Sequence, residues 1–279
     1  MPELPEVETT RKGVSPYCLN QAVKEVDVRQ PSLRWPIPDN LAEKLCGQTI
    51  RTVSRRGKYL LFGFDRGTLL IHLGMSGSLR ILLQNEAVKK HDHVDIIMQS
   101  GHILRYHDPR RFGAILWTEE PVAAHKLIAH LGPEPLSDDF NPDYLARRCA
   151  KRKTAIKNLI MDSKVVVGVG NIYANEALFL SGIHPQQAAG KLSTVQLSKL
   201  TENIRLVLER SIEQGGTTLK DFVGGDGKPG YFAQQLNVYG RAGSECVQCH
   251  SLLRHTLLQE IRQNNRSSVF CPSCQPILD

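Results

Sequence analysis

Between residues 22 and 118, short runs rich in Val, Ile and Leu are separated by Gly, Pro and polar residues. Runs of this length, each closed by turn-forming residues, are typical of strands in packed antiparallel sheets. The pattern therefore predicts a β-sandwich, with strands at residues 22–29, 50–55, 59–64, 68–72, 79–83, 94–99, 102–105 and 114–118.

The pattern changes to helical spacing beyond the segment Leu131-Gly132-Pro133-Glu134-Pro135, whose Gly and Pro content indicates a linker. Ser193 is a suitable N-cap for the last helix, and Gly215-Gly216 is a suitable stop. Residues 224–230 are too rich in glycine for regular structure, and they predict either a mobile loop or a simple connection. The predicted helices lie at residues 142–150, 154–161, 172–181 and 193–214.

The N-terminus, Pro2-Glu3, allows two interpretations. Proline is favoured at the first position of a helix, and a carboxylate in the first turn complements the helix dipole. Alternatively, removal of Met1 gives Pro2 a terminal secondary amine, which can attack a sugar carbon and form a cationic iminium. The two interpretations are compatible, because a helix that begins here would hold the amine in place.

Near the C-terminus, the pairs Cys246-x-x-Cys249 and Cys271-x-x-Cys274 are separated by 21 residues. Two such pairs joined by a hairpin supply the four thiolates that a tetrahedral zinc ion needs. His250 and His255 compete as ligands, but the symmetric four-cysteine set is simpler and leaves no open position for a substrate. The sequence thus predicts one structural Zn²⁺.

The two arginines between these cysteine pairs, Arg262 and Arg266, can meet phosphates, although a solvated charged hairpin is an equal alternative.

The chain has 279 residues, of which 41% are hydrophobic, enough for two domains of ordinary size. Its 35 Lys and Arg residues outnumber 28 Asp and Glu, and the net charge of +7 favours a polyanionic partner. No apolar run approaches the length of a membrane span, and the acidic start contradicts a targeting peptide. We therefore expect a cytoplasmic protein that binds no membrane. The single cysteines Cys18, Cys46 and Cys149 fit a reducing compartment.

Three turns carry candidate binding groups. Gly74-Met75-Ser76-Gly77 offers either a core-capping methionine or an exposed wedge, and Arg110-Arg111-Phe112 offers either a structural salt bridge or an intercalating cluster. Gly168-Val169-Gly170-Asn171 opens a helix and can receive a phosphate, although an ordinary N-cap explains it equally well.

Together with the two termini, these segments closely resemble the bacterial formamidopyrimidine-DNA glycosylases. The resemblance covers practically the whole chain, and its motifs occur in the order of the family. It is carried by residues 2–9, 55–59, 72–80, 91–93, 108–113, 168–173, 226–232 and 239–241 and by the four paired cysteines.

The resemblance implies an α+β fold in three parts. Residues 1–131 would form an N-terminal β-sandwich catalytic domain with flanking helices. Residues 132–236 would form a helix-two-turns-helix DNA-binding domain with a lesion-capping loop, and residues 237–279 a zinc-finger β-hairpin. The spacer between the cysteine pairs is a few residues longer than the family usually has, and we expect the hairpin tip to accommodate the excess.

The resemblance also implies a bifunctional DNA glycosylase and AP lyase of base excision repair. It would excise oxidised purines, such as 8-oxoguanine and formamidopyrimidines, opposite cytosine in double-stranded DNA, and would act as a monomer. Pro2 would form a Schiff base, Glu3 would protonate the sugar ring oxygen, and Lys58 and Arg266 would assist β- and δ-elimination. The implied wedges in the DNA are Met75, Arg110 and Phe112. The implied phosphate contacts are Lys58, His91, Arg152, Asn171 and Arg266, with His72, Arg111 and Lys157 as further helpers.

Two rival functions remain open at this point. The related endonuclease VIII type shares the architecture but prefers oxidised pyrimidines, so parallel cleavage of the two kinds of lesion would discriminate. A non-catalytic zinc-ribbon regulator would bind DNA without producing a strand break or a borohydride-trapped adduct.

Overall fold

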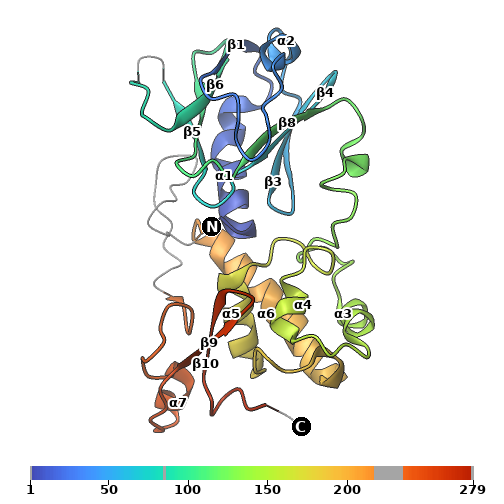
Figure 1. Cartoon of the computed structure of the whole chain (residues 1–279), viewed down its shortest axis with the longest axis vertical. Helices are drawn as coiled ribbons and strands as arrows, with labels where there is room; N and C mark the ends of the chain where they lie inside the picture. Colours follow the sequence, from blue (N-terminus) through green and yellow to red (C-terminus); the bar gives the residue numbers. More distant parts are fainter. Residues whose placement is uncertain (1, 84–85, 217–234, 278–279) are drawn as a thin grey trace. The chain divides into compact units, whose positions relative to one another are not determined.

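The computed structural model describes residues 2–83, 86–216 and 235–277. Contacts within the chain divide it into two compact units, which are labelled by element in Figure 1. One unit comprises Met1–His130 with Ile212–Ala233, and the other comprises Leu131–Ser211 with Gln234–Asp279. The glycine-rich segment at residues 224–230, predicted as a loop, lies outside the described residues.

The first unit contains two antiparallel four-stranded sheets, as the strand pattern predicts. All eight expected strands are confirmed, with ends that differ by at most two residues. One sheet has the order β1 (Val23–Val28), β6 (Asp92–Met98), β7 (Ile103–His107) and β5 (Ser78–Leu82), and the other has β2 (Thr52–Arg56), β3 (Tyr59–Phe64), β4 (Gly67–His72) and β8 (Ala114–Thr118).

A single apolar core joins these strands to helix α1 (Leu4–Cys18). The helix buries Val7, Val14 and Cys18 against strand residues such as Phe62. Because α1 begins at Leu4 with Glu3 as its N-cap, Pro2 precedes the helix and does not occupy its first position. The short helices α2 (Leu41–Leu45) and η1 (Val122–Ala124) were not predicted, since elements of one turn carry no periodic signal.

All four predicted helices are confirmed, and all but the last two residues of α6 belong to the second unit. They are α3 (Pro142–Cys149), α4 (Ile156–Ile160), α5 (Asn171–Ser181) and α6 (Thr194–Glu213), together with the short η2 (Ala189–Lys191). Helix α4 is shorter than expected, because Ala155 is extended and forms a bridge with Ala188. Gly215 and Gly216 end α6 in left-handed conformations, with φ of 75° and 83°. Within the described ranges, no helix is long and apolar enough to cross a membrane.

The cysteine-bearing hairpin consists of β9 (Gln259–Gln263) and β10 (Arg266–Phe270), and it follows the short helix α7 (Val247–Ser251). Asn264 and Asn265 connect the strands, with φ of 47° and 59°, as a two-residue type I′ turn requires. A two-residue turn is the shortest common connection in a hairpin, so the hairpin tip holds no additional residues. The expectation that the tip accommodates the longer spacer between the cysteine pairs is therefore wrong. The loop at residues 252–258 separates α7 from the hairpin.

Candidate functional site

The start of α1 is connected to the turn that carries Lys58. Pro2 and Glu3 are buried, and the backbone N–H of Glu3 donates to Glu6 Oε2 over 2.8 Å. One turn further along the helix, Glu8 accepts from Arg55 Nε at 3.2 Å, and Arg55 Nη1 donates to the carbonyl of Gly57 at 2.9 Å. Glu8 thereby fixes the β2–β3 turn relative to the N-terminus.

This β2–β3 turn has two residues, Gly57 and Lys58, between the paired positions Arg56 and Tyr59. Gly57 has φ of 55°, which suits the first central position of a type II′ turn and leaves Lys58 at the tip. Burial alone would raise the pKa of Glu8, but the guanidinium groups of Arg11 and Arg55 outweigh it and hold the pKa below its usual value. The carboxylate of Glu8 therefore stays charged.

A buried carboxylate, Asp108, organises the two turns that bear Met75 and Phe112. Its Oδ1 accepts from the hydroxyl of Ser76 at 2.9 Å, and its Oδ2 accepts from the N–H of Gly113 at 2.9 Å. Tyr106 also donates its hydroxyl to Oδ2 at 3.2 Å. Because one fully buried side chain binds both turns, their separation is fixed by hydrogen bonds in addition to backbone geometry.

The two turns border a cavity of about 600 Å³. Met75 and Phe112 are 41% and 46% exposed, and the Arg110 guanidinium carbon lies 5.1 Å from the centre of the Phe112 ring. The structure thus brings together the predicted wedge residues. The cavity is lined by Leu33, Arg34, His72, Gly74, Met75, Arg111 and Phe112.

Arg34 was not predicted as a site residue. It comes from the irregular segment after β1, and its backbone N–H donates to the carbonyl of Gly113 at 3.1 Å. Its guanidinium lies over the Trp35 ring at 4.8 Å. The bond to Gly113 joins segments far apart in sequence, so it left no local pattern. The adjacent Arg34-Trp35 pair was the one sequence signal that could have pointed to Arg34.

His72 is held in its neutral form. Burial, followed by the charges of Lys58 and Arg34, lowers the pKa of His72 to about 4. Its Nδ1 accepts from the N–H of Gly74 at 3.0 Å, so the proton of the neutral ring is on Nε2. His72 is therefore a neutral donor beside the turn that carries Met75.

A charged network supports the segment that leads to His91. Arg105 is 2% exposed and donates to Asp95 through Nε at 2.8 Å and Nη2 at 2.7 Å, and its Nη1 donates to the carbonyl of Ala87 at 3.2 Å. Asp92 accepts from the N–H of Lys89 at 2.8 Å and from His107 Nδ1 at 2.8 Å. Residues 86–91 are thus held to the sheet by side chains of β6 and β7.

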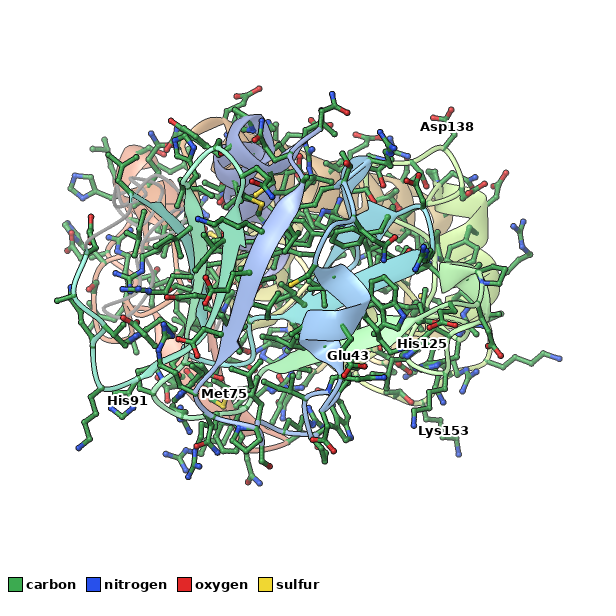
Figure 2. The ribbon with its side chains drawn as sticks, turned by 90° about the horizontal axis from the view of Figure 1, so that it is seen from above. Glu43, Met75, His91, His125, Asp138 and Lys153 are labelled. Atoms are coloured by element: carbon green, nitrogen blue, oxygen red, sulfur yellow. The ribbon has the colours of Figure 1, made fainter. Side chains whose placement is uncertain are left out.

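His91 itself is half-buried and lies along the same margin of the molecule as Met75 in the view of Figure 2. Its carbonyl accepts from the N–H of Asp108 at 3.0 Å, which links it to the two turns described above. Burial, together with the neighbouring cation Lys90, lowers the pKa of His91. The ring is therefore ready to donate a hydrogen bond without carrying a permanent charge.

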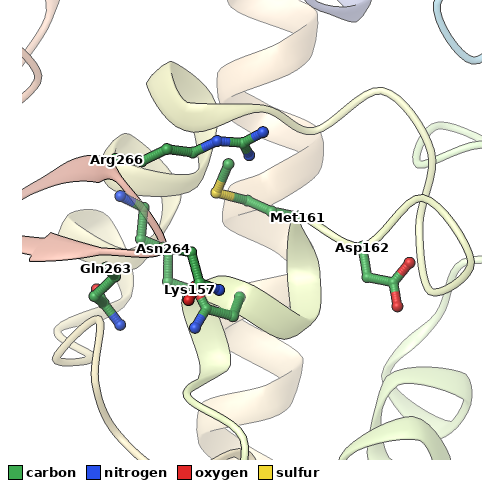
Figure 3. Close-up of a pocket in the computed structure, with 7 residues that line it drawn as sticks. Lys157, Met161, Asp162, Gln263, Asn264 and Arg266 are labelled. Carbon is green, nitrogen blue, oxygen red and sulfur yellow. The ribbon is translucent and has the colours of Figure 1, made fainter.

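In the second unit, Arg266 and Lys157 border a cavity of about 220 Å³. Figure 3 shows the Arg266 side chain leaving the hairpin and reaching the side chain of Met161. Lys157, in contrast, is 1% exposed, and its ammonium donates to Ser267 O at 2.7 Å and Ser268 Oγ at 2.6 Å. The two cations therefore face different surroundings.

Asn171 is the first residue of α5, one position before the predicted start, and the glycine before it is the N-cap. Arg152 is exposed in the turn after α3, where Gly190 approaches it so closely that a Cβ would stand 2.8 Å from the Arg152 nitrogen. Both residues belong to the same unit as Arg266.

The four paired cysteines form the cluster that their spacing predicts. Their sulfur atoms lie within 4.8 Å of one another, and three pairs are separated by 3.8, 3.6 and 3.5 Å. Four thiolates around a tetrahedral zinc ion stand about 3.8 Å apart, so the donor set fits this metal. His250 and His255 are turned toward Glu245, at 3.3 and 3.0 Å, and are not part of the cluster.

Comparison with known proteins agrees with this architecture. The model of the formamidopyrimidine-DNA glycosylase N-terminal domain matches residues 1–115, and that of the H2TH domain of the same enzymes matches residues 131–223. Formamidopyrimidine-DNA glycosylases of Shewanella piezotolerans and Hydrogenovibrio crunogenus are 58% and 55% identical, with 99% and 100% of this chain and 99% and 98% of theirs aligned.

Solved structures give the same result. The MutM (Fpg) protein of Thermus thermophilus superimposes with a TM-score of 0.87 at 33% identity, over 100% of both chains. The Lactococcus lactis Fpg in complex with DNA that contains an abasic site gives 0.89 at 31% identity, over 98% of this chain and 99% of that one. The sandwich, the H2TH helices and the four-cysteine hairpin define a DNA repair glycosylase. The chain belongs to the formamidopyrimidine-DNA glycosylase family.

Proposed function

We propose that this glycosylase removes oxidised purines, such as 8-oxoguanine and formamidopyrimidines, opposite cytosine in double-stranded DNA and then cleaves the strand as an AP lyase. The observation that carries the proposal is the buried Pro2-Glu3 pair ahead of α1, connected through Glu8 and Arg55 to the turn of Lys58. Lactococcus lactis relatives have been solved with DNA that contains a Fapy-dG lesion, which supports the same class of substrate.

The chemical step begins with the secondary amine that Pro2 presents once Met1 is removed. A terminal amine titrates near pH 8, so on the order of a tenth is neutral at pH 7, and neighbouring cations increase that fraction. The amine attacks C1′, the damaged base departs with the bonding electrons, and a proton from Glu3 allows the sugar ring to open. The product is an iminium between Pro2 and the deoxyribose.

The iminium acidifies the C2′ proton, and two eliminations then break the 3′ and the 5′ phosphate esters in turn. Lys58 assists the first elimination and Arg266 the second. A guanidinium is a poor proton donor, so the contribution of Arg266 is to hold the phosphate electrostatically. Final hydrolysis of the iminium returns Pro2 to its free amine.

Access to the lesion requires the nucleotide to leave the helix, at a cost of a few kcal/mol. Met75, Arg110 and Phe112 fill the vacated space and offset that cost, since their turns are fixed in advance by Asp108. Arg110 carries only donors, and the exposed edge of an unpaired cytosine offers acceptors. Recognition therefore depends on the opposite base.

Phosphate contacts fall to His91, Arg152, Asn171 and Arg111, with His72 donating through its neutral Nε2. The guanidinium groups of Arg152, Arg111 and Arg266 are charged, so increasing salt weakens DNA binding steeply. Lys157 was predicted as a further helper of this kind, but its ammonium is buried and donates to the carbonyl of Ser267.

The zinc ion is proposed as a structural cofactor. Cys246, Cys249, Cys271 and Cys274 would hold it in a closed shell, which fixes the hairpin and takes no part in the reaction. The protein is proposed to act as a monomer in the bacterial cytoplasm.

Oxidised pyrimidines are the second candidate substrate. A Lactococcus lactis relative has been solved with DNA that contains an oxidised pyrimidine, and it is 32% identical to this chain. The Pro2-Glu3-Leu4-Pro5-Glu6 start favours the purine branch of the family.

Cleavage of duplexes that contain 8-oxoguanine opposite cytosine, run beside duplexes with thymine glycol, tests the proposal. We expect faster cleavage of the purine lesion, with 3′- and 5′-phosphate ends that report both eliminations. Preferential cleavage of thymine glycol would contradict the assigned substrate, and binding without cleavage would favour a regulator.

A further inference from the structure

The outer edge of strand β10 is covered by side chains of two helices. Ser267 and Val269 stand opposite Arg262 and Glu260 in the hairpin. Gln263 and Arg266 flank the two-residue turn and form a hydrogen-bonded pair, so the backbone groups of positions 267 and 269 point away from β9. An edge of this kind needs other partners when it is buried.

Lys157 of α4 covers the first of these groups. Its ammonium donates to the carbonyl of Ser267 at 2.7 Å and to Ser268 Oγ at 2.6 Å. The hydroxyl of Ser268 in turn donates a hydrogen bond to Gln263 Oε1 at 2.7 Å, on the other strand and next to the turn. The hydrogen bonds that start at Lys157 therefore reach Gln263 on one side of the turn and, on the other side, Ser267, which directly follows Arg266.

Asn175 of α5 covers the second group. Its Oδ1 accepts from the N–H of Val269 at 2.8 Å, and its Nδ2 donates to the carbonyl of Asn171 at 2.6 Å. Asn175 is 1% exposed, so neither bond is exchanged for water without cost. A single amide thus joins the first residue of α5 to the strand that begins with Arg266.

We propose that Lys157 and Asn175 form a clamp that positions Arg266 and Asn171 relative to each other for binding the DNA backbone. The two side chains replace a third strand along β10, and Arg266 is the first residue of that strand, directly before the clamped Ser267. Lys157 and Asn175 are positioning residues, and neither contacts the DNA. The proposal rests on the assignment of Arg266 and Asn171 as phosphate contacts.

The geometry favours this role for Lys157 over a phosphate contact. Its ammonium is engaged by the hairpin beneath Arg266, while Figure 3 shows the Arg266 side chain extending out of the hairpin. A cation that is 1% exposed would have to break two short hydrogen bonds to reach a phosphate.

The first test measures the clamp in the free, zinc-loaded protein and requires no activity. In Asn175→Leu, which is nearly isosteric, we expect the Val269 amide to exchange with deuterium at least about tenfold faster, because its acceptor is gone. Asn175→Asp retains Oδ1 and should retain the protection. Unchanged exchange in Asn175→Leu, or loss of zinc from it, would overturn the clamp.

The second test measures affinity for a duplex that contains an abasic-site analogue. Lys157→Met and Asn175→Leu should each weaken binding about tenfold, whereas Lys164→Met, which removes an exposed lysine of the same unit, should not. When Arg266→Ala is already present, each of the two clamp substitutions should weaken binding by less than about a further twofold, because their effect on affinity passes through Arg266.

Full additivity in that background would overturn the positioning role. If Arg266→Ala alone leaves the affinity unchanged, the assigned role of Arg266 fails and the functional part of the clamp fails with it. Deuterium exchange of the Val269 amide still decides whether the clamp exists. Failure of the clamp is therefore distinguishable from failure of the role assigned to Arg266.

Discussion

The carboxylate of Asp108 accepts a hydrogen bond from the hydroxyl of Ser76, and this contact ties the turn of Met75 to the turn of Arg110 and Phe112. The same carboxylate accepts from the N–H of Gly113. Both bonds are buried, so water does not compete for them. The three proposed wedge residues are therefore arranged before DNA arrives, and binding energy is not spent on ordering them.

Gly74→Ala should disrupt this arrangement. Gly74 has φ of 62°, and a Cβ there would stand 2.5 Å from the nitrogen of Gly113, which is backbone and cannot move aside. Gly47→Ala is the matched control, since Gly47 has φ of 79° but nothing within 4 Å. We expect both to lose about 1 kcal/mol of stability from backbone strain, and Gly74→Ala about 1–3 kcal/mol more from the clash. Equal urea midpoints for the two variants would contradict the close approach of the turns.

Arg105→Met should be strongly destabilising. It removes the buried cation that Asp92 and Asp95, both 3% exposed, share, and leaves them only the less buried Arg80 and Arg29, a change that costs about 3 kcal/mol. The exposed pair of Arg51 and Asp65 provides the control, and Arg51→Met should be indistinguishable from the parent protein. Chemical denaturation of the three proteins at pH 7 measures the difference, and a parent-like Arg105→Met would show that the network does not hold the 86–91 segment.

Stability should fall in mild acid because of His72. Its pKa is lowered to about 4 in the folded protein, so between about pH 6.5 and 4 the unfolded state binds the extra proton and is favoured as the pH falls. Between pH 7 and pH 4.5 the parent should lose about 2 kcal/mol more than His72→Asn, which cannot titrate. Identical losses in urea titrations at the two pH values would mean that His72 does not stay neutral in the fold.

Removal of the metal should weaken DNA binding and leave the sandwich folded. Cys249→Ser takes one of four mutually close thiolates from the cluster, and we expect zinc retention and affinity for damaged DNA to be lost together. Cys46→Ser is the control, because Cys46 is exposed and lies outside the cluster. Undiminished DNA binding by zinc-free Cys249→Ser would remove the hairpin from the interface.

Much of the fold follows from local patterns in the sequence. The eight strands were predictable because each buries a short β-branched run closed by a turn, and helices such as α6 have both a periodic face and glycine stops. The four cysteines were predictable because metal ligation leaves a fixed spacing. In each case the physical cause acts over a few residues.

The contacts that arrange the site could not be predicted in this way. Arg34 reaches its cavity through a bond to Gly113, and Asn175 bridges Asn171 and Val269 from what looks like an ordinary helical position. In the sequence alone, Lys157 cannot be distinguished from a basic residue that binds a phosphate, and its burial is seen only in the structure. Such roles depend on tertiary contacts across many residues, which carry no local periodicity.

The most direct test of the central claim locates the covalent bond. The protein is incubated with a duplex that contains 8-oxoguanine opposite cytosine in the presence of borohydride, digested with a protease, and analysed by tandem mass spectrometry. We predict that the reduced deoxyribose remnant is attached to the nitrogen of Pro2 at a terminus from which Met1 has been removed, and that Pro2→Gly loses most of the adduct. A remnant on Lys58, or active protein that retains Met1, would contradict the account.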